Sequence, residues 1–268
     1  MSQIKQILAT EILTYEFKQQ ASEAFSNHNP IRHIVIDNFL QPEIAEKIFQ
    51  NFPGIDNMNT HYKGINEKKA EHSDFSHLHP YFETVRNTLA SNDFTEWLTS
   101  ITNIPSLESV PDRLGYGLHQ GANNSFLDVH VDYNIHPIKK LYRKLNLILF
   151  FNSEWKDSWG GHLELWDKDV KNCIQKISPV LNRCVIFECS SVSYHGYKKI
   201  TVPEGITRKS YYQYFFTPIP LNTNYHDTIF KPVPETGITK KTLTLSKDMI
   251  KNVAKKVFYT IGLKKFLK

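Results

Sequence analysis

Beyond Pro111 the chain breaks into short runs of strand-forming residues separated by Gly, Asn, Pro and Asp, and this pattern constrains the fold more than any other feature. Many short strands with turn residues between them are typical of a β-sandwich or jelly roll. We therefore expect a mainly β fold with flanking helices (α+β). The expected strands cover 113–119, 127–132, 144–152, 162–166, 174–177, 183–188, 192–195 and 209–217.

The segment 1–110 has a different pattern, in which apolar residues recur mostly at helical spacing. Residues 3–26 and 80–98 show this spacing, and 31–36 alternate as a strand does. Residues 55–78 are polar and without a sustained period, which predicts a long surface loop, and long loops are often lids. We assign residues 1–110 to a helical support with a lid region, in one domain with the β core at 111–220.

The remaining segment, 221–268, is expected to be a linker followed by a basic helix. Residues 239–268 hold nine lysines and one acid, Asp248, so this tail has a net charge of +8 and the rest of the chain sums to −3. Ser246 is the expected cap of an amphipathic helix that ends at Gly262. Such a helix can dock on its own domain, pair with another subunit or lie on an anionic membrane surface.

The sequence favours a cytoplasmic protein. Cys173, Cys184 and Cys189 are odd in number and form no CxxC pair, which argues against a disulfide framework or a zinc site. The first residues lack the apolar core of a secretory signal, and no stretch of 18 apolar residues could span a membrane. The oligomeric state is left open.

His130 and Asp132 lie two residues apart near the end of an expected strand. Because a strand alternates its side chains between two faces, both point to the same side while Val131 points away. His195 is the candidate third ligand. Two histidines and one carboxylate on one side of a metal leave open positions, as in non-haem Fe(II) sites that bind a cosubstrate and oxygen.

Alternative interpretations exist for each ligand, because an isolated His-x-Asp occurs by chance in many chains. His130 could be a hydrogen-bonded core histidine, and Asp132 a turn residue. His136 and His162 are competing ligands, but Pro137 and a Gly-Gly turn place them better as outer or surface groups. The chain has no GxSxG or HExxH motif that would indicate another catalytic site.

Arg208 enters the last expected strand, where Arg208, Ser210, Tyr212 and Tyr214 share one face by parity. A guanidinium can form two parallel hydrogen bonds to a carboxylate, and a nearby hydroxyl can complete the site. This pair is suited to a dicarboxylate cosubstrate. The alternative is a surface arginine in an ion pair.

Together these residues resemble the Fe(II)/2-oxoglutarate-dependent oxygenases of the prolyl 4-hydroxylase-like superfamily. The combined spacing is far more specific than any one motif. The resemblance covers about residues 31–218 and rests on His130-x-Asp132, His195, Arg208-x-Ser210, the run 144–152, the run 160–165 and the opening segment 34–43.

The resemblance implies a double-stranded β-helix in which His130, Asp132 and His195 hold iron and form the catalytic set. Arg208 would bind the distal carboxylate of 2-oxoglutarate, and ascorbate would serve as a reductant. The reaction would consume O2 and release succinate and CO2. Related halogenases lack the carboxylate found here at Asp132, so the resemblance implies hydroxylation, or a desaturation or ring-closing variant, rather than halogenation.

One position departs from the better-known members of that group. Phe150 stands where many members place a tyrosine that helps to bind 2-oxoglutarate, so nearby polar residues must substitute. Asn146 could instead be an ordinary buried amide, and Tyr116 could be simple core packing. The expected cosubstrate-binding residues are Arg208, Ser210, Asn146, His119 and Tyr116.

The substrate is left open by the sequence. A peptidyl or amino-acid substrate, a saccharide and a natural-product intermediate all fit a small-molecule or peptidyl partner. One alternative function is a non-catalytic β-helix module that binds a ligand. Another is a nucleic-acid demethylase of the same chemistry, but the acidic body and a tail whose lysines do not alternate with aromatics argue against nucleic acid as a partner.

Overall fold

The computed structural model describes residues 3–246. Its helices are α1 (Gln3–Ile7), α2 (Tyr15–Asn27), α3 (Pro42–Gln50), α4 (Pro80–Leu89), α5 (Asn92–Thr102) and a C-terminal helix over 238–246. Its strands are β1 (His33–Ile36), β2 (Thr60–Lys63), β3 (Glu67–His72), β4 (Glu108–Ser109), β5 (Tyr116–Gly121), β6 (Phe126–Val131), β7 (Tyr142–Phe150), β8 (Leu163–Trp166), β9 (Cys173–Ile177), β10 (Cys184–Glu188), β11 (His195–Tyr197), β12 (Arg208–Thr217) and β13 (Ile229–Phe230).

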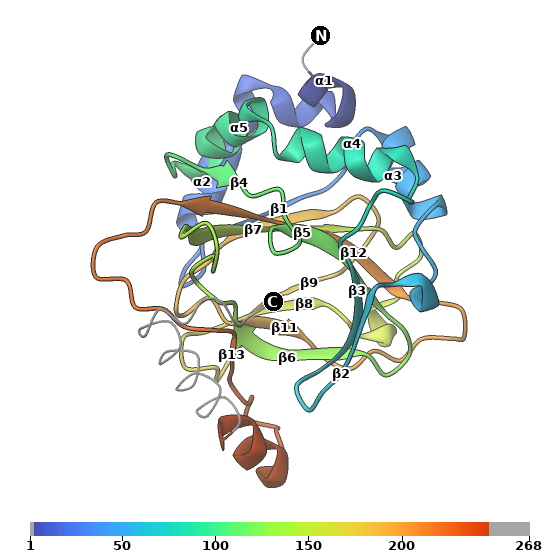
Figure 1. Ribbon diagram of the computed structural model, residues 1–268, viewed down its shortest axis with the longest axis vertical. Coiled ribbons are helices and arrows are strands. Elements are labelled where there is room, and N and C mark those ends of the chain that lie inside the picture. Colours follow the sequence, from blue (N-terminus) through green and yellow to red (C-terminus); the bar gives the residue numbers. More distant parts are fainter. Residues whose placement is uncertain (1–2, 247–268) are drawn as a thin grey trace.

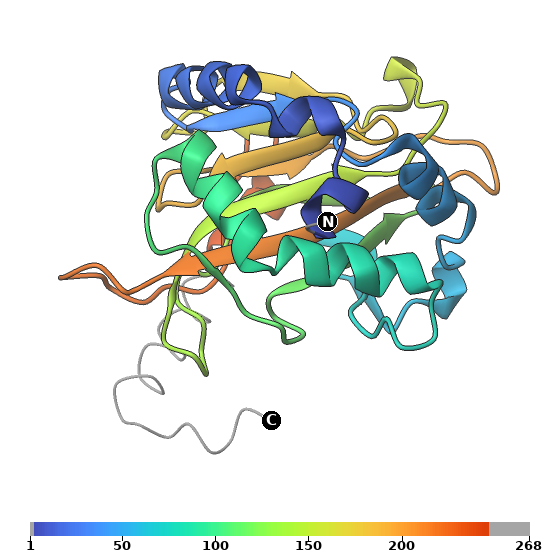
Figure 2. The same ribbon diagram turned by 90° about the horizontal axis from the view of Figure 1, so that it is seen from above.

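The described strands join into one curled antiparallel sheet in the order β1-β10-β7-β12-β5-β3-β6-β11-β8-β9. Its first half forms a major sheet under the helices, and its second half, from β6 to β9, folds back beneath it (Figure 1). Viewed from above, α2 to α5 lie across the strands of the major sheet (Figure 2). The predicted mainly β fold with flanking helices is confirmed.

The central pair of strands, β7 and β12, shows how the sequence produces these layers. Leu145, Leu147 and Leu149 are fully buried in the core between the helices and the major sheet. The alternate residues Asn146 and Phe150 therefore point into the space between the two sheets, opposite Tyr214 and Ser210 of β12 in the pairing register. One face of each strand builds the helix-covered core, and the other builds the interior of the β fold.

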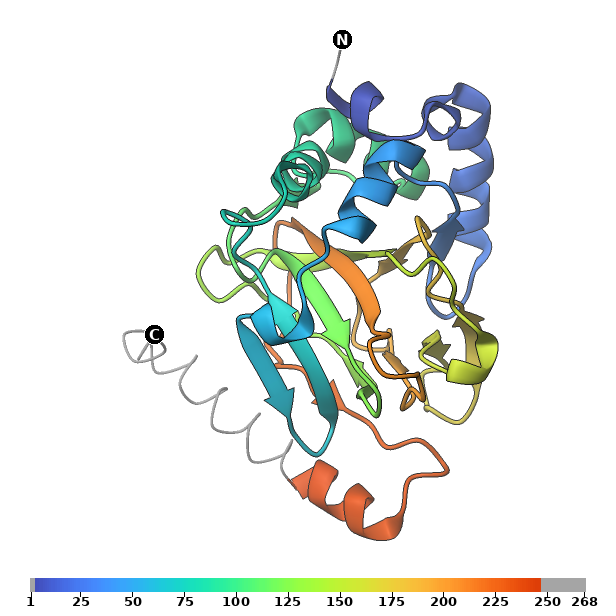
Figure 3. The ribbon, with the colours of Figure 1, turned by 90° about the vertical axis from the view of Figure 1, so that its right-hand side faces the viewer.

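The helical spacing predicted over 80–98 is confirmed, and it belongs to two helices, because Ser91 caps α5 by accepting a hydrogen bond from the Phe94 backbone N–H. The prediction of a long surface loop over 55–78 is wrong. The polar stretch 55–78 contains the hairpin of β2 and β3, and β3 pairs with both β5 and β6 (Figure 3). Its strand pattern was hidden because the residues that face the interior are charged.

The C-terminal helix begins at residue 238, so the prediction that Ser246 caps its start is wrong. The remainder of the predicted amphipathic helix, to Gly262, lies outside the described residues. Within 238–246 the helix docks on the β fold beside the β2–β3 hairpin (Figure 3). Among residues 3–246, no helix has the length and apolar composition needed to cross a membrane.

Asn182, just before β10, ties the helical layer to the sheet. Its side-chain amide exchanges two hydrogen bonds of 2.8 Å with the backbone N–H and C=O of Leu40, and it is 5% exposed. Its φ of 61° is in the left-handed region, which asparagine tolerates better than most residues. One side chain thus satisfies two buried backbone groups at a turn.

Asn182→Ala should lower the free energy of unfolding by about 2–4 kcal/mol, because two buried backbone groups lose their partners and alanine strains the positive φ. Urea unfolding of the full chain measures the loss. Asn222→Ala is the matched control, because Asn222 has a φ of 62° but is exposed. Equal losses in the two variants would show that backbone strain alone explains the effect.

Candidate metal centre and cosubstrate site

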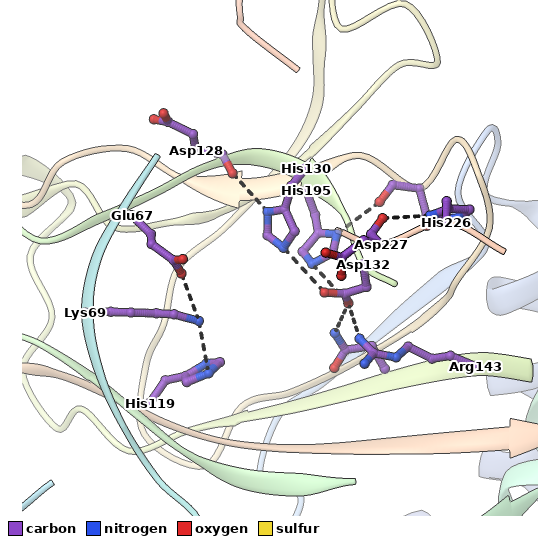
Figure 4. Close-up of polar contacts among 12 residues, drawn as sticks. Glu67, Lys69, His119, Asp128, His130, Asp132, Arg143, His195, His226 and Asp227 are labelled. Carbon is purple, nitrogen blue, oxygen red and sulfur yellow. Dashed lines mark hydrogen bonds and ion pairs between the residues drawn. The ribbon is translucent and has the colours of Figure 1, made fainter. Parts of the chain in front are cut away.

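Pairing of β6 with β11 places His195 directly opposite His130, and Asp132 follows β6 immediately. Asp132 Oδ1 lies 3.5 Å from His130 Nε2, and Asp132 Oδ2 lies 3.7 Å from His195 Nε2. The three ligand atoms lie within 4.8 Å of one another (Figure 4). The three residues predicted as ligands are therefore brought together, although His195 lies far from the other two in the sequence.

The histidine tautomers are set by backbone carbonyls. His130 Nδ1 lies 2.9 Å from the carbonyl oxygen of Asp128, and His195 Nδ1 lies 3.0 Å from that of Ser193. A carbonyl only accepts, so each Nδ1 carries the proton and each Nε2 presents a lone pair toward Asp132. Burial and the neighbouring His130 lower the pKa of His195 to about 4, which keeps it neutral and able to bind a metal at neutral pH.

Arg143 and Asn146 hold the carboxylate of Asp132 from the other side. Arg143 Nη1 lies 3.0 Å from Asp132 Oδ2, and Asn146 Nδ2 donates to the same oxygen at 3.3 Å. The Arg143 guanidinium is stacked between the rings of Tyr133 and Tyr214, each 3.6 Å from its central carbon. Burial opposes ionisation of Asp132, but the charge of Arg143 outweighs it and holds the pKa of Asp132 well below its usual range.

This donor set fits a divalent metal such as Fe(II). It offers two neutral imidazole nitrogens and one ionised carboxylate oxygen, arranged on one side of a common point. His130 and Asp132 also line a cavity of about 250 Å³, so the remaining coordination positions would face open space. The arrangement can therefore bind a metal and leave room for a cosubstrate.

The wall opposite the candidate metal ligands comes from β3 and β5. Glu71 accepts a hydrogen bond from Tyr212 at 2.7 Å and faces His119 at 3.4 Å. Lys69 lies 3.3 Å from His119 and 3.7 Å from Glu67 (Figure 4). Burial opposes ionisation of Glu71, but its hydrogen bond with His119 and the nearby charges lower its pKa to about 2. The cavity thus has a strongly polar wall of paired charges.

Arg208 lies farther along the interior face of β12, and it is 5% exposed. Its Nε donates to the carbonyl of Gly161 at 2.7 Å, and its guanidinium stacks on the rings of Phe150 and Tyr197. Burial lowers its pKa to about 10, so it stays charged at neutral pH. Within residues 3–246, no carboxylate forms an ion pair with Arg208. The terminal N–H groups of its guanidinium, here called the fork, are therefore available to an anionic ligand.

The other predicted cosubstrate residues point to one face of the sheet or the other, according to their position along the strand. Ser210 and His119 are paired across β12 and β5 and face the interior with Arg208, and Asn146 faces it from β7. Tyr116 faces the opposite way. It packs in the core beneath the helices, where its hydroxyl accepts a hydrogen bond from Arg86 at 3.0 Å, so its assignment to the pocket is corrected.

Sequence reasoning missed the residues that surround the ligands. Arg143 went unnoticed because its partner, Asp132, follows a different strand, β6. Glu67, Lys69 and Glu71 were hidden in the presumed loop, because Lys68 between the first two is charged as well and the alternation of a strand with one polar face is broken.

Comparison with known proteins supports this geometry. Residues 116–216 match the sequence model of the 2OG-Fe(II) oxygenase superfamily, a range that contains the three ligands and Arg208. The chain resembles this superfamily, as the motifs predicted. The match covers the β core, and the helical support and C-terminal segment lie outside it.

The chain is similar to curated proteins and to solved structures. The chain is 27% identical over 197 residues to the prolyl 3-hydroxylase OGFOD1 of Mus musculus, covering 71% of this chain and 33% of that protein. The chain thus spans about a third of the length of this curated relative. Solved structures match as well, among them two prolyl hydroxylases. They are a Pseudomonas putida prolyl-4-hydroxylase (14% identity, 75% of this chain, 98% of that chain, TM-score 0.53) and a Trichoplax adhaerens prolyl hydroxylase in complex with a peptide fragment (15%, 78%, 93%, 0.55). The fold is therefore the double-stranded β-helix.

The purified chain should bind one Fe(II), or Ni(II) as an inert substitute, and His195→Ala should weaken binding at least about 100-fold, because one of three ligands is lost. Isothermal titration with Ni(II) measures both affinities. His162→Ala is the control, because His162 pairs with Asp157 away from the centre. Unchanged Ni(II) affinity in His195→Ala would place the metal elsewhere.

Proposed function

We propose that the chain is an Fe(II)- and 2-oxoglutarate-dependent dioxygenase that hydroxylates a small-molecule or peptidyl substrate. The observation that carries the proposal is the combination of three converging ligand atoms with a buried arginine, free of any carboxylate among the described residues, on the same interior surface. The similarity to the superfamily supports it. His130, Asp132 and His195 would hold the metal, and Arg208 would hold a carboxylate of 2-oxoglutarate.

Each interior residue has a role in this proposal. Arg208 would form the two parallel hydrogen bonds that a carboxylate accepts, and Ser210 would add a hydroxyl. His119 and Asn146 are polar groups on the same surface and would help to orient the cosubstrate. The carbonyl of Gly161 fixes the Arg208 fork, which reduces the entropy lost on binding.

The iron centre, when bound, supplies an oxidant made from O2. Overall, 2-oxoglutarate, O2 and a C–H bond give succinate, CO2 and a C–OH group, and ascorbate would reduce iron that has become oxidised. The chain's own contribution is to hold both reactants in place and to limit the access of water. Because Asp132 fills a ligand position, we favour hydroxylation, with desaturation or ring closure as variants that product analysis would reveal, over halogenation.

A peptidyl substrate is the first to test, since the relatives are prolyl hydroxylases and one was solved with a peptide. Free amino acids, saccharides and natural-product intermediates follow. A non-catalytic binding module is disfavoured by the preserved ligand set, and the acidic body disfavours a nucleic-acid substrate. The cytoplasmic setting remains our proposal from cysteine usage, and all three cysteines are unpaired.

Arg208→Met should raise the KM for 2-oxoglutarate about 10- to 100-fold, because charge-assisted hydrogen bonds to one carboxylate are lost while the metal ligands remain. Succinate release with Fe(II) and 2-oxoglutarate measures it. Lys209→Met is the matched control: Lys209 is the next residue on β12 and lines a different pocket, beside the end of α3. A protein that binds neither metal nor 2-oxoglutarate would refute the proposed function.

A further inference from the structure

We propose that the C-terminal helix 238–246 is a latch that fixes the β2–β3 hairpin, and with it the polar wall of the cavity, against the metal-ligand strand β6. Thr244 and Lys240 are its positioning residues. The structural part of the proposal stands on contacts alone. That the latched wall contacts the substrate rests on the proposed function.

The latch lies where the edge of β6 changes its partner strand from β3 to β13, at Asp128. We call this point the seam. Before this point β3 pairs with β6, and the carbonyl of Asn66 accepts a hydrogen bond from the Asp128 backbone N–H at 2.8 Å. After it, the Lys231 backbone N–H donates to the carbonyl of Val129 at 2.8 Å, and β13 pairs with β6 opposite His130. Two segments far apart in sequence thus share the edge of the strand that carries a metal ligand.

At this seam the helix contacts both the residue before β3 and β6 itself. Thr244 Oγ1 donates to Asn66 Oδ1 at 2.7 Å, and the Lys240 ammonium lies 2.9 Å and 2.6 Å from the two carboxylate oxygens of Asp128. The two helix residues are four apart and therefore project from the same side of the helix. In Figure 3 the helix lies against the end of the hairpin where β2 turns into β3.

The hairpin depends on this attachment because its outer strand has little other support. β2 pairs with β3 alone among the described strands, and most of its residues are exposed. Asn66 directly precedes β3, whose residues Glu67, Lys69 and Glu71 line the cavity. A displacement of Asn66 would therefore move the wall that faces the metal ligands.

The hydroxyl of Thr244 is the main determinant. Thr244 is 2% exposed and Asn66 is 4% exposed, so loss of the hydroxyl would leave a buried amide oxygen without a donor. The Lys240–Asp128 ion pair is partly exposed, and such pairs contribute little on their own. It would chiefly orient the helix so that Thr244 meets Asn66.

The test is amide hydrogen exchange of the full, metal-free chain carrying Thr244→Val, which keeps the side-chain shape but removes the hydroxyl. Exchange in residues 60–68 should become at least about fivefold faster, as expected when local opening loses one buried hydrogen bond. Thr244→Ser should restore slow exchange. Thr242→Val is the matched control, since the Thr242 hydroxyl donates within the helix, to the carbonyl of Ile238.

Two results would overturn the latch. Exchange in 60–68 equal to that of Thr242→Val would show that the hydroxyl does not hold the hairpin, and faster exchange throughout the protein would show a general role in stability.

Binding of 2-oxoglutarate to the Ni(II)-loaded protein gives a second readout. In Thr244→Val we expect the Kd for 2-oxoglutarate to rise several-fold, because Lys69 and Glu71 of the hairpin contact His119, a proposed cosubstrate residue, while the Kd for Ni(II) changes less than about twofold. No 2-oxoglutarate binding by the unaltered protein would refute the proposed function and leave the exchange result valid.

Discussion

The buried ion pair between Arg143 and Asp132 is the interaction on which the interior depends. Removing either partner would leave a charge uncompensated in a site from which water is largely excluded, and such a charge is strongly destabilising. Arg143 belongs to β7 in the major sheet, whereas Asp132 follows β6 in the minor sheet. The pair therefore connects the two sheets across the interior, at the point where the ligands converge. It also occupies Asp132 Oδ2, which leaves Oδ1 to face His130.

The positive charges on this interior surface are of two kinds, those already paired with acidic residues and one that is not. Arg143 is committed to Asp132, and Lys69 lies beside Glu67 and His119. Among the described residues on this surface, the guanidinium of Arg208 is thus the buried cation whose fork is not occupied by a carboxylate. A dianionic ligand would therefore be drawn to the Arg208 end, with its other end toward the metal. The direction in which a cosubstrate would lie follows from which charges are already paired.

The sequence correctly predicted the features that depend on a local pattern of residues. Predictions failed where the position of a side chain depends on residues far away in the sequence. Alternation located the strands that carry His130 and Arg208, and parity placed Ser210 correctly beside Arg208. Parity also could have excluded Tyr116, because residues three apart in a regular strand, such as Tyr116 and His119, face opposite sides. The charged side of β3 could not be recognised as interior, because charge normally indicates exposure and its partners, such as Tyr212, are far away in the sequence.

These failures concern the part of the molecule that would distinguish one substrate from another. The candidate metal ligands and Arg208 lie within the segment that matches the superfamily, residues 116–216, but Glu67, Lys69 and Glu71 lie outside it. On the proposed function, the reaction type would thus be set by the β core, and the polar wall that meets the substrate by a hairpin and a helix added at its two ends. Because those additions hold each other through Asn66 and Thr244, their sequences are constrained jointly. Changes in the hairpin that alter the polar wall would therefore have to preserve the contact between Asn66 and Thr244.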